Sequence, residues 1–342
     1  MFKKITEKVR FHSPLKGFEL DVQDIEYRMD PLTGKWSRVN VQRSKRIKQG
    51  EGKFECEELV KRSRKNCFFC PENIQRSTPM FDKGLIPAGR IRRGETWVFP
   101  NLFPFARHHA VATLTEEHFL RTGGFKETHI EDTLLAGLEF CRAISSRDEH
   151  AGYSTFNWNH LFPSGASIIH PHVQITLDSR PTYMTERLLD ASRKYFKNTG
   201  KNYWDVLVSE ERRLKERFIG TVDGMHFMAS YSPFGNNEVL IVFEDKSSFT
   251  DLKDDEVSSL SAGIVKVLKA YEAMYVESFN LTTYSGHAEG VSEGFNLHMR
   301  FISRAMPNPY YTSDVGFMEG LHFERVVESM PEDVATVARR FF

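Results

Sequence analysis

The sequence has few cysteines, no long apolar run and no excess of charge of one sign. Its 342 residues include 4 cysteines, which are too few for a disulfide framework in a chain of this length. No apolar run approaches the roughly 18 residues that a membrane-spanning helix needs, and no signal-peptide core follows the polar start. We therefore expect a cytoplasmic protein with no membrane partner.

Charge is balanced along the chain, with 46 Lys and Arg residues against 46 Asp and Glu residues. A balanced charge, with no basic stripe interleaved with aromatic residues, argues against a nucleic-acid partner. No glycine-rich phosphate loop is visible, so we expect no redox cofactor. What is abundant is phenylalanine, with 28 residues, which indicates aromatic-rich cores in an ordinary globular protein.

Hydrophobic periodicity predicts the same order of elements twice. The first half has strand-like runs and one helical pattern at 96–99, 110–114, 130–144 and 173–177, and the second half repeats this order at 227–231, 239–243, 254–276, 279–283 and 297–302. Two further helices are expected at 184–197 and 204–217, between the halves. His170-x-His172 would then correspond to His298-x-Arg300. We infer a duplicated α+β unit, with domains at residues 1–198 and 199–342.

The segment from Asn159 to Gln174 is the richest in chemistry and ends in His-Pro-His-Val-Gln. In an extended strand, alternate side chains share a face, so His170, His172 and Gln174 would line one surface. A neutral imidazole is a good nucleophile at phosphorus, and a carboxamide can donate hydrogen bonds to a phosphate oxygen. The flanking Asn, Gly and Ser residues favour phosphoryl transfer over a buried strand whose histidines bond to the backbone.

Two of the cysteines form the pair Cys67-x-x-Cys70, followed by proline. This spacing offers two thiolates from one turn, as in zinc sites. A redox dithiol is the alternative interpretation, since two cysteines alone supply only half of a tetrahedral site. Cys56 and Cys141 have no such spacing, and we expect them to be ordinary, non-ligand residues.

The histidine segment resembles the galactose-1-phosphate uridylyltransferase branch of the histidine-triad superfamily. The family pattern Asn-x5-Gly-x-Ser-x2-His-Pro-His-Gly-Gln matches at Asn159, Gly165, Ser167, His170, Pro171, His172 and Gln174. The resemblance implies that His172 is the nucleophile that becomes nucleotidylated. It also implies that Gln174 and Ser167 hold the transferred phosphoryl group, with Asn159 and Gly165 in the same site. Val173 departs from the family's glycine.

The same resemblance implies a fold and a metal site. The fold would be α+β, with two tandem histidine-triad-like units, each an antiparallel sheet packed with helices, and catalysis in the first. A structural Zn²⁺ would be held by Cys67, Cys70, His118 and His170. His108 and His109 are rival third ligands. A second metal of some family members aligns with Leu188, His287, His298 and Arg300, where two of the four ligands are missing, so we expect no metal there.

Other matching segments suggest substrate contacts. Segment 28–36 resembles the family's N-terminal Pro-Leu-Thr-Gly-x-Trp motif, and segments 101–104 and 316–324 resemble its nucleoside and hexose segments. The candidate contacts taken from these segments and from the basic run at 43–46 are Arg28, Arg43, Asn101, Phe317 and His322. The family often has Asp at Leu102 and has Tyr-Glu at Leu321-His322. Altered polar groups of this kind change which sugar a site accepts.

These features predict a nucleotidyltransferase that moves a nucleoside monophosphate from a nucleotide sugar to a sugar phosphate through His172, in galactose or related carbohydrate metabolism. A phosphorylase of nucleotide sugars or dinucleoside polyphosphates, with inorganic phosphate as the acceptor, is the alternative with the same chemistry. A histidine-triad hydrolase and a non-catalytic nucleotide-binding protein are alternatives of other classes. The family further implies a homodimer whose sites form between subunits.

Overall fold

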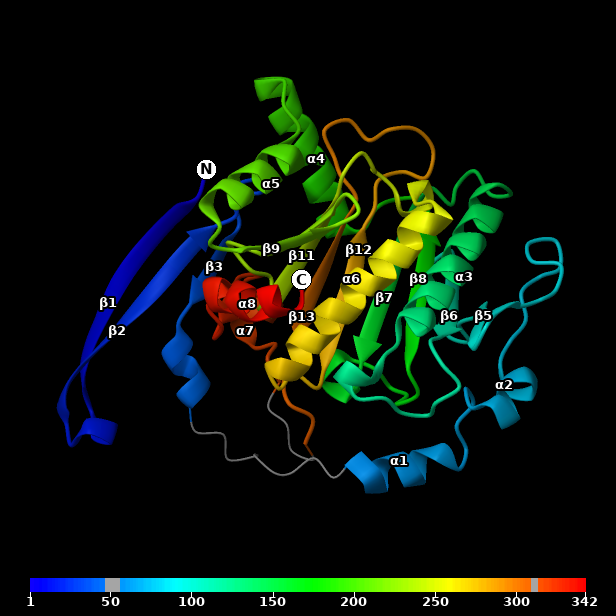
Figure 1. Cartoon of the computed structure of the whole chain (residues 1–342), viewed down its shortest axis with the longest axis horizontal. Coiled ribbons are helices and arrows are strands. Elements are labelled where there is room, and N and C mark those ends of the chain that lie inside the picture. Colours follow the sequence, from blue (N-terminus) through cyan, green and yellow to red (C-terminus); the bar gives the residue numbers. More distant parts are fainter. Residues whose placement is uncertain (47–55, 309–312) are drawn as a thin grey trace.

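The computed structural model describes residues 1–46, 56–308 and 313–342, whose strands form two sheets (Figure 1). The larger sheet has ten strands in the order β4-β5-β6-β8-β7-β12-β13-β11-β10-β9. These strands are β4 (Ile91–Arg93), β5 (Thr96–Pro100), β6 (His108–Thr113), β7 (Tyr153–His160), β8 (His172–Asp178), β9 (Phe218–Val222), β10 (Met225–Ala229), β11 (Asn236–Phe243), β12 (Phe279–Tyr284) and β13 (His298–Ser303). The smaller sheet consists of β1 (Lys3–Ser13), β2 (Glu19–Met29), β3 (Trp36–Val39) and β14 (Arg325–Val327).

Two long helices, α3 (Glu127–Ser145) and α6 (Asp254–Ala273), lie side by side across one face of the large sheet (Figure 1). Each buries one apolar stripe, such as Leu134, Leu138 and Ile144 in α3, as expected for helices that cover a sheet. The other helices are α1 (Cys56–Arg64), α2 (Pro71–Ser77), α4 (Tyr183–Thr199), α5 (Tyr203–Leu214), α7 (Phe317–Gly320) and α8 (Pro331–Ala338). None of the described helices combines the length and apolar character of a membrane span.

The large sheet confirms the predicted duplication. Its strand order is symmetric about the pairing of β7 with β12, where Asn159 lies opposite Asn280. The first half contributes β4 to β8 with α3, and the second half contributes β9 to β13 with α6. Both sets of strands share one buried apolar cluster with the two long helices. The fold is therefore α+β, with two antiparallel units joined edge to edge, and the proposed division at residue 198 falls within the last turn of α4.

The register of the repeat differs from the predicted one by two residues. The amide of Leu114 donates to the carbonyl of Pro171 at 3.0 Å, and the amide of Phe243 makes the same bond to Leu297 at 3.1 Å. Pro171 therefore corresponds to Leu297, and His172 corresponds to His298. Counting from the preceding prolines could not reveal this shift, because the loops of the two halves differ in length.

Helix α5 is shorter than its sequence pattern predicts. It ends at Leu214 because Lys215 adopts a left-handed conformation with φ 58° and caps it. Arg217, expected on the helix, is instead a buried residue that donates to Glu211 at 2.9 Å. The chain can therefore turn directly into β9.

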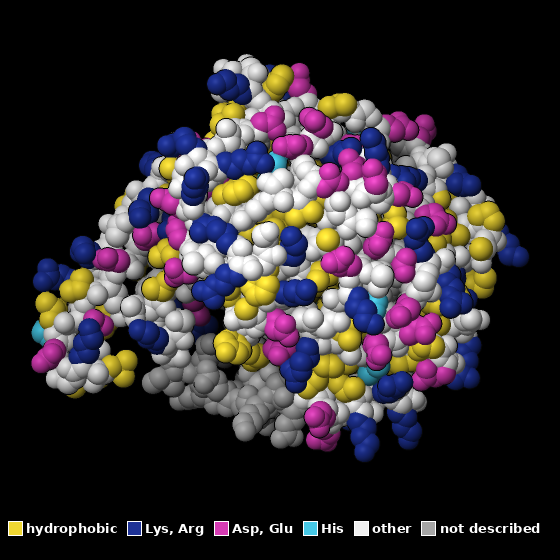
Figure 2. All heavy atoms as spheres, in the orientation of Figure 1, with side chains coloured by type: hydrophobic (Ala, Val, Ile, Leu, Met, Phe, Trp, Pro, Cys, Tyr) yellow, Lys and Arg dark blue, Asp and Glu magenta, His cyan; other side chains and the backbone are white. Residues whose placement is uncertain are grey.

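The β1–β2 ribbon projects from the body of the protein (Figure 1). Its strands pair along 11 residues each, and most of their side chains are exposed. Figure 2 shows hydrophobic side chains among charged ones on this ribbon, and interspersed basic and acidic side chains over the visible face of the body.

Candidate active site and metal centre

The predicted motif lies on β7 and β8. Along these strands, successive side chains face the buried core and an open cleft in turn. On β8, Val173, Ile175 and Leu177 belong to the buried core, so the side chains between them face the other side of the sheet. That side holds a cleft of about 900 Å³, which is large enough for a nucleotide-sized ligand. The cleft is lined by Phe105, Thr155, Asn157, Asn159, Gly165, Gln174, Thr176, Asp178, Arg180, Pro181, Thr182, Tyr183, Met184, Glu186, Thr282, Thr283 and Tyr284.

His172 begins β8 on the same strand face as Gln174. Its Nδ1 lies 2.8 Å from the carbonyl oxygen of His170, which can only accept, so Nδ1 carries the proton. The lone pair of the neutral ring is therefore on Nε2, which makes no hydrogen bond to any described residue and is not sealed from solvent. Burial lowers the pKa of His172 and favours this neutral form. The ring is set up as a nucleophile.

Gln174 lies next to two polar side chains from the β5–β6 hairpin. Its Oε1 is 2.8 Å from His109 Nε2 and 3.5 Å from Asn101 Nδ2. The structure thus brings Asn101, predicted as a nucleoside contact, beside the predicted phosphoryl contact. The sequence suggested His109 only as a rival metal ligand, whereas the structure places it beside Gln174.

The loop between β7 and β8 brings Asn159 and Gly165 together. Gly165 has φ 93°, and a Cβ built on it would lie 3.7 Å from Asn159 Nδ2. Asn280, from the second half, donates to Asn159 Oδ1 at 2.6 Å and to the carbonyl of Ser164 at 2.9 Å. Asn280 from the second half thus holds the β7–β8 loop in place, which no pattern in the sequence indicated. Ser167 is exposed on this loop and does not line the cleft.

Behind the catalytic loop lies the predicted cluster of Cys67, Cys70, His118 and His170. All four side chains are buried, and their ligand atoms lie within 4.8 Å of one another. Cys70 Sγ is 3.3 Å from His118 Nδ1, and each sulfur is 3.7 Å from His170 Nδ1. A tetrahedral zinc ion, with bonds of about 2.3 Å to sulfur and about 2.1 Å to nitrogen, would place such atoms about 3.6 Å apart. The cluster therefore fits a metal ion.

The surroundings of the cluster also fit a cation. His170 Nε2 lies 2.9 Å from the carbonyl of Thr115 and His118 Nε2 lies 2.9 Å from Ser63 Oγ, so both rings can turn Nδ1 toward the cluster. Burial and the neighbouring Cys67 raise the pKa of the Cys70 thiol to about 12 in the absence of a metal. A bound cation would offset this cost and keep both sulfurs as thiolates. His108 lies outside the cluster, and its Nε2 is 2.7 Å from Asp148 Oδ2.

Phe69, which lies between the two cysteines in the sequence, connects the cluster to the nucleophile. Its ring centroid is 5.3 Å from that of His172 and 6.1 Å from that of His170, with edge-on geometry in both pairs. The backbone carbonyl of the ligand His170 also orients His172. Any shift of the metal-binding turn would therefore reach the His172 ring.

The other predicted substrate contacts lie away from the cleft within one chain. Arg28 is buried, and its guanidinium bonds Glu26 at 2.8 Å and Glu332 at 2.9 Å. Arg43 is exposed in the 3₁₀ turn after β3. Phe317 and His322 pack against each other on and just after α7, with ring centroids 6.4 Å apart. None of the four is among the residues that line the cleft beside Gln174.

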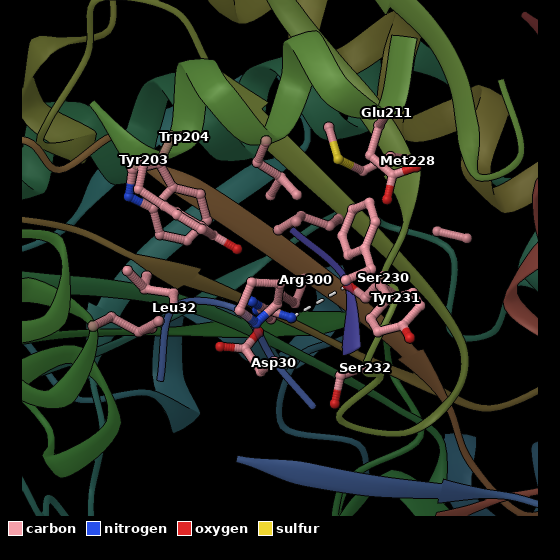
Figure 3. Close-up of a pocket in the computed structure, with 16 residues that line it drawn as sticks. Asp30, Leu32, Tyr203, Trp204, Glu211, Met228, Ser230, Tyr231, Ser232 and Arg300 are labelled. Carbon is pink, nitrogen blue, oxygen red and sulfur yellow. Dashed lines mark hydrogen bonds between the residues drawn. The ribbon is translucent and has the colours of Figure 1, made fainter. Parts of the chain in front are cut away.

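The equivalent region of the second half is closed. Arg300, at the position of Gln174, pairs with Glu238, and its guanidinium lies 4.1 Å from the centroid of the Phe234 ring. Figure 3 shows Arg300 between Asp30 and Ser230, at the edge of a cavity of about 20 Å³. Such a volume holds about one water molecule. Around Arg300, the described residues of the second half therefore leave no room for a nucleotide.

Comparisons with known proteins support this assignment of the fold. No protein-family model matches the chain. A protein of Archaeoglobus fulgidus described only as uncharacterized is 29% identical over 341 residues, which cover 100% of this chain and 98% of that protein. An ADP-glucose phosphorylase from Arabidopsis thaliana, solved with bound ADP-glucose, aligns with a TM-score of 0.72 and 20% identity over 92% of this chain and 98% of the other.

A uridylyltransferase structure aligns with a TM-score of 0.67 and 18% identity, over 92% of this chain and 98% of the other. At these identities the likeness concerns the fold. The predicted resemblance is confirmed for the fold, which this chain shares with a uridylyltransferase structure and an ADP-glucose phosphorylase structure.

Proposed function

We propose that this protein is a nucleotidyltransferase that forms a covalent nucleotide adduct on Nε2 of His172. The observation that carries this proposal is the tautomer of His172, whose Nδ1–H is committed to the His170 carbonyl at 2.8 Å. The unprotonated Nε2 remains available on the side of the sheet that holds the cleft. Known structures of the same fold include one named a uridylyltransferase and one named an ADP-glucose phosphorylase with bound ADP-glucose.

The transfer would take place in two displacement steps. His172 Nε2 attacks the α-phosphorus of a nucleotide sugar, and the bond from that phosphorus to the bridging oxygen breaks, releasing a sugar phosphate. An oxygen of an acceptor phosphate then attacks the same phosphorus, and the phosphorus–nitrogen bond breaks to restore the neutral ring. Gln174, with Asn159 and Gly165 nearby, would stabilise the negative charge on the non-bridging oxygens.

The acceptor would be a sugar phosphate or inorganic phosphate. Arg180 lines the cleft, is exposed, and has no ion-pair partner among residues 1–46, 56–308 and 313–342, so its charge is free for a phosphate. The hydroxyl and amide groups of Thr155, Asn157 and Thr282 in the same cleft suit a sugar. Transfer to a sugar phosphate makes the protein a uridylyltransferase-like enzyme, whereas transfer to inorganic phosphate makes it a nucleotide-sugar phosphorylase.

Zinc is the cation we propose for the cluster of Cys67, Cys70, His118 and His170. Two sulfur and two nitrogen ligands in a closed, buried arrangement suit a structural zinc ion with no open position. When bound, the ion would hold the catalytic loop in place. The chain's own residues would carry out the transfer.

We also propose that the protein is a homodimer. The β1–β2 ribbon exposes Val9, Leu15 and Phe18 at 41%, 85% and 68%, and a two-stranded ribbon gains little stability without a covering surface. Phe317 is 69% exposed yet far from the lining of its own cleft. A second copy would cover the ribbon and could bring Arg43, Phe317 and His322 to the cleft of its neighbour.

Intact mass spectrometry tests the proposal directly. The protein is mixed separately with UDP-glucose, ADP-glucose and a dinucleoside polyphosphate, without an acceptor. A mass gain of one nucleoside monophosphate is expected, stable in base and lost in acid, and its size identifies the base. His172→Gln should abolish the gain, whereas the variant of an exposed histidine, His150→Gln, should retain it.

The adduct is then discharged with inorganic phosphate or with galactose 1-phosphate. Faster loss with one of them distinguishes the phosphorylase from the transferase. Rapid loss in buffer alone would indicate a hydrolase. Tight nucleotide binding without any adduct would contradict the proposal and indicate a binding protein.

A further inference from the structure

His109 contacts Gln174 and Phe105, which line the cleft, and the proposed chemistry gives it no part. It belongs to β6 and lies opposite Thr176 of β8, so its ring reaches the same sheet face as Gln174. The side chain is buried, and the Phe105 ring packs edge-on against it at 4.3 Å between centroids. Because buried polar groups are normally hydrogen-bonded, both ring nitrogens of His109 should have partners.

The hydrogen bonds of His109 define its tautomer. The backbone amide of Phe105 can only donate, and it points at Nδ1 from 3.4 Å. Nδ1 is therefore the acceptor, and the single proton of the neutral ring is on Nε2, 2.8 Å from Gln174 Oε1. Burial lowers the pKa of His109, in agreement with a neutral ring. His109 therefore donates to the carbonyl oxygen of Gln174.

A second donor acts on the same oxygen. Asn101 Oδ1 accepts from the backbone amide of Phe103 at 2.9 Å, so the Asn101 NH₂ group lies near both His109 Nε2, at 3.2 Å, and Gln174 Oε1, at 3.5 Å. Because Nε2 carries the His109 proton, the Gln174 oxygen is the atom that can accept from this group. With two donors on its oxygen, the Gln174 amide cannot flip without losing both bonds. Its own NH₂ group then points away from the hairpin, and it makes no hydrogen bond to any residue that the structure describes.

We infer that His109 is a positioning residue that fixes the Gln174 carboxamide, so that its NH₂ group faces the phosphoryl group transferred to His172. This inference rests on the proposed function. In this interpretation, the hairpin between β5 and β6 determines which of its two orientations the Gln174 amide adopts. A flipped Gln174 would present its carbonyl oxygen to the anionic phosphoryl oxygens and oppose the transfer.

The test is a double-mutant cycle on the rate of adduct formation at saturating donor. His109→Ala should slow that step by roughly 10- to 100-fold, with little change in the donor concentration that gives half the maximal rate. In the Gln174→Ala background, His109→Ala should change the rate by less than about threefold, because its effect acts through Gln174. Circular dichroism should show that all variants are folded at the temperature of the assay.

Two conservative replacements distinguish positioning from packing. The amide nitrogen of His109→Gln can take the place of Nε2 and should restore most of the rate. The amide of His109→Asn corresponds to Nδ1 and should not restore it. His108→Ala is the matched control, because the neighbouring ring bonds Asp148 outside the cleft, and it should keep the wild-type rate.

Equal losses from His109→Ala in both backgrounds, or no loss in either, would overturn the inference. The ¹⁵N shifts of the His109 ring supply a readout that does not depend on catalysis. They should report Nε2–H, and an Nδ1–H ring would also overturn it. If the wild-type protein forms no adduct with any donor while the ¹⁵N shifts report Nε2–H, the proposed function is what fails, and the catalytic part of the inference fails with it.

Discussion

His298 holds, in the second half of the molecule, the strand position that His172 holds in the first. Each ring places Nδ1 on the carbonyl oxygen two residues earlier, at 2.8 Å for His172 and 2.9 Å for His298. What surrounds the two rings differs. His298 is stacked between Trp204 at 4.0 Å and Tyr284 at 4.9 Å, and its Nε2 is enclosed without a hydrogen-bond partner in the described part of the chain.

This difference predicts that each chain carries one nucleotide. A phosphorus atom can approach Nε2 of His172 from the cleft, whereas the aromatic rings cover His298. His298→Ala should therefore still form the adduct, and peptide mapping should place the nucleotide only on the peptide that contains His172. Because removing a buried ring leaves a cavity, His298→Ala should also lower the melting temperature. A second nucleotide on wild-type chains, or loss of the adduct in a folded His298→Ala protein, would contradict this prediction.

The sequence predicted most of the fold, because periodicity and duplication are local signals. The stripe of α3 and the alternation of β8 could be identified from apolar residues alone. The end of α5 could not, because it depends on the backbone conformation of Lys215. The register of the repeat could not be identified either, because it is defined by backbone hydrogen bonds, which align His298 with His172 and not with His170.

The site was predicted in part. The motif gave His172 and Gln174, and the resemblance supplied four possible metal ligands that the fold brings together. His109 was predicted only as a rival metal ligand and Asn280 was not predicted, because their partners are distant in sequence and single histidines or asparagines carry no pattern. One chain places Arg43, Phe317 and His322 outside the cleft. The proposed dimer would have to bring them to it, and no local motif in a sequence encodes such an assembly.

Metal removal should impair the site through Phe69. A chelator strong enough to remove zinc should release one ion per chain, lower the melting temperature and expose the thiols of Cys67 and Cys70 to alkylation. Adduct formation should slow, because Phe69 packs against the His172 ring at 5.3 Å. Zinc addition should reverse these effects. Cys141, whose thiol pKa is raised to about 12 by burial, should stay unlabelled in both states and serves as the internal control.

Metal analysis and alkylation mass spectrometry check this prediction together. Native protein without bound metal, or with Cys67 and Cys70 labelled as fast in the presence of zinc as in its absence, would exclude the metal. If adduct formation keeps the wild-type rate after all the metal has been removed, the metal is not needed for catalysis.

Arg180→Gln should weaken use of the acceptor and leave the first step intact. Its exposed charge lines the cleft without an ion-pair partner in the described chain, so losing it should raise the acceptor concentration at half-maximal rate by about tenfold, as for one charge-assisted hydrogen bond. Adduct formation in the absence of acceptor should keep its rate. Arg187→Gln is the matched control, because Arg187 is paired with Glu186 on α4. If the two variants have equal acceptor kinetics, Arg180 does not bind the acceptor.

His160 should make folding stability sensitive to acid. Its ring is fully enclosed against Phe279, and Nε2 has no hydrogen-bond partner among the described residues. Burial lowers its pKa from the usual 6.5 to about 3. Because the folded pKa lies below the unfolded one, the unfolded chain takes up the proton first as pH falls. The contribution of His160 is thus fully present above pH 6.5 and is lost progressively between 6.5 and about 3.

Replacing this ring with phenylalanine removes the titration while keeping an aromatic side chain in place. Between pH 7.5 and 5.5, the wild-type protein should lose about 1.4 kcal/mol more of its free energy of unfolding than His160→Phe does. Urea unfolding at both pH values measures the difference. His150→Gln, which changes an exposed histidine, should keep the wild-type loss. If His160→Phe also keeps it, the folded protein must protonate His160 without strain, and the enclosed ring would have to reach water at pH 5.5.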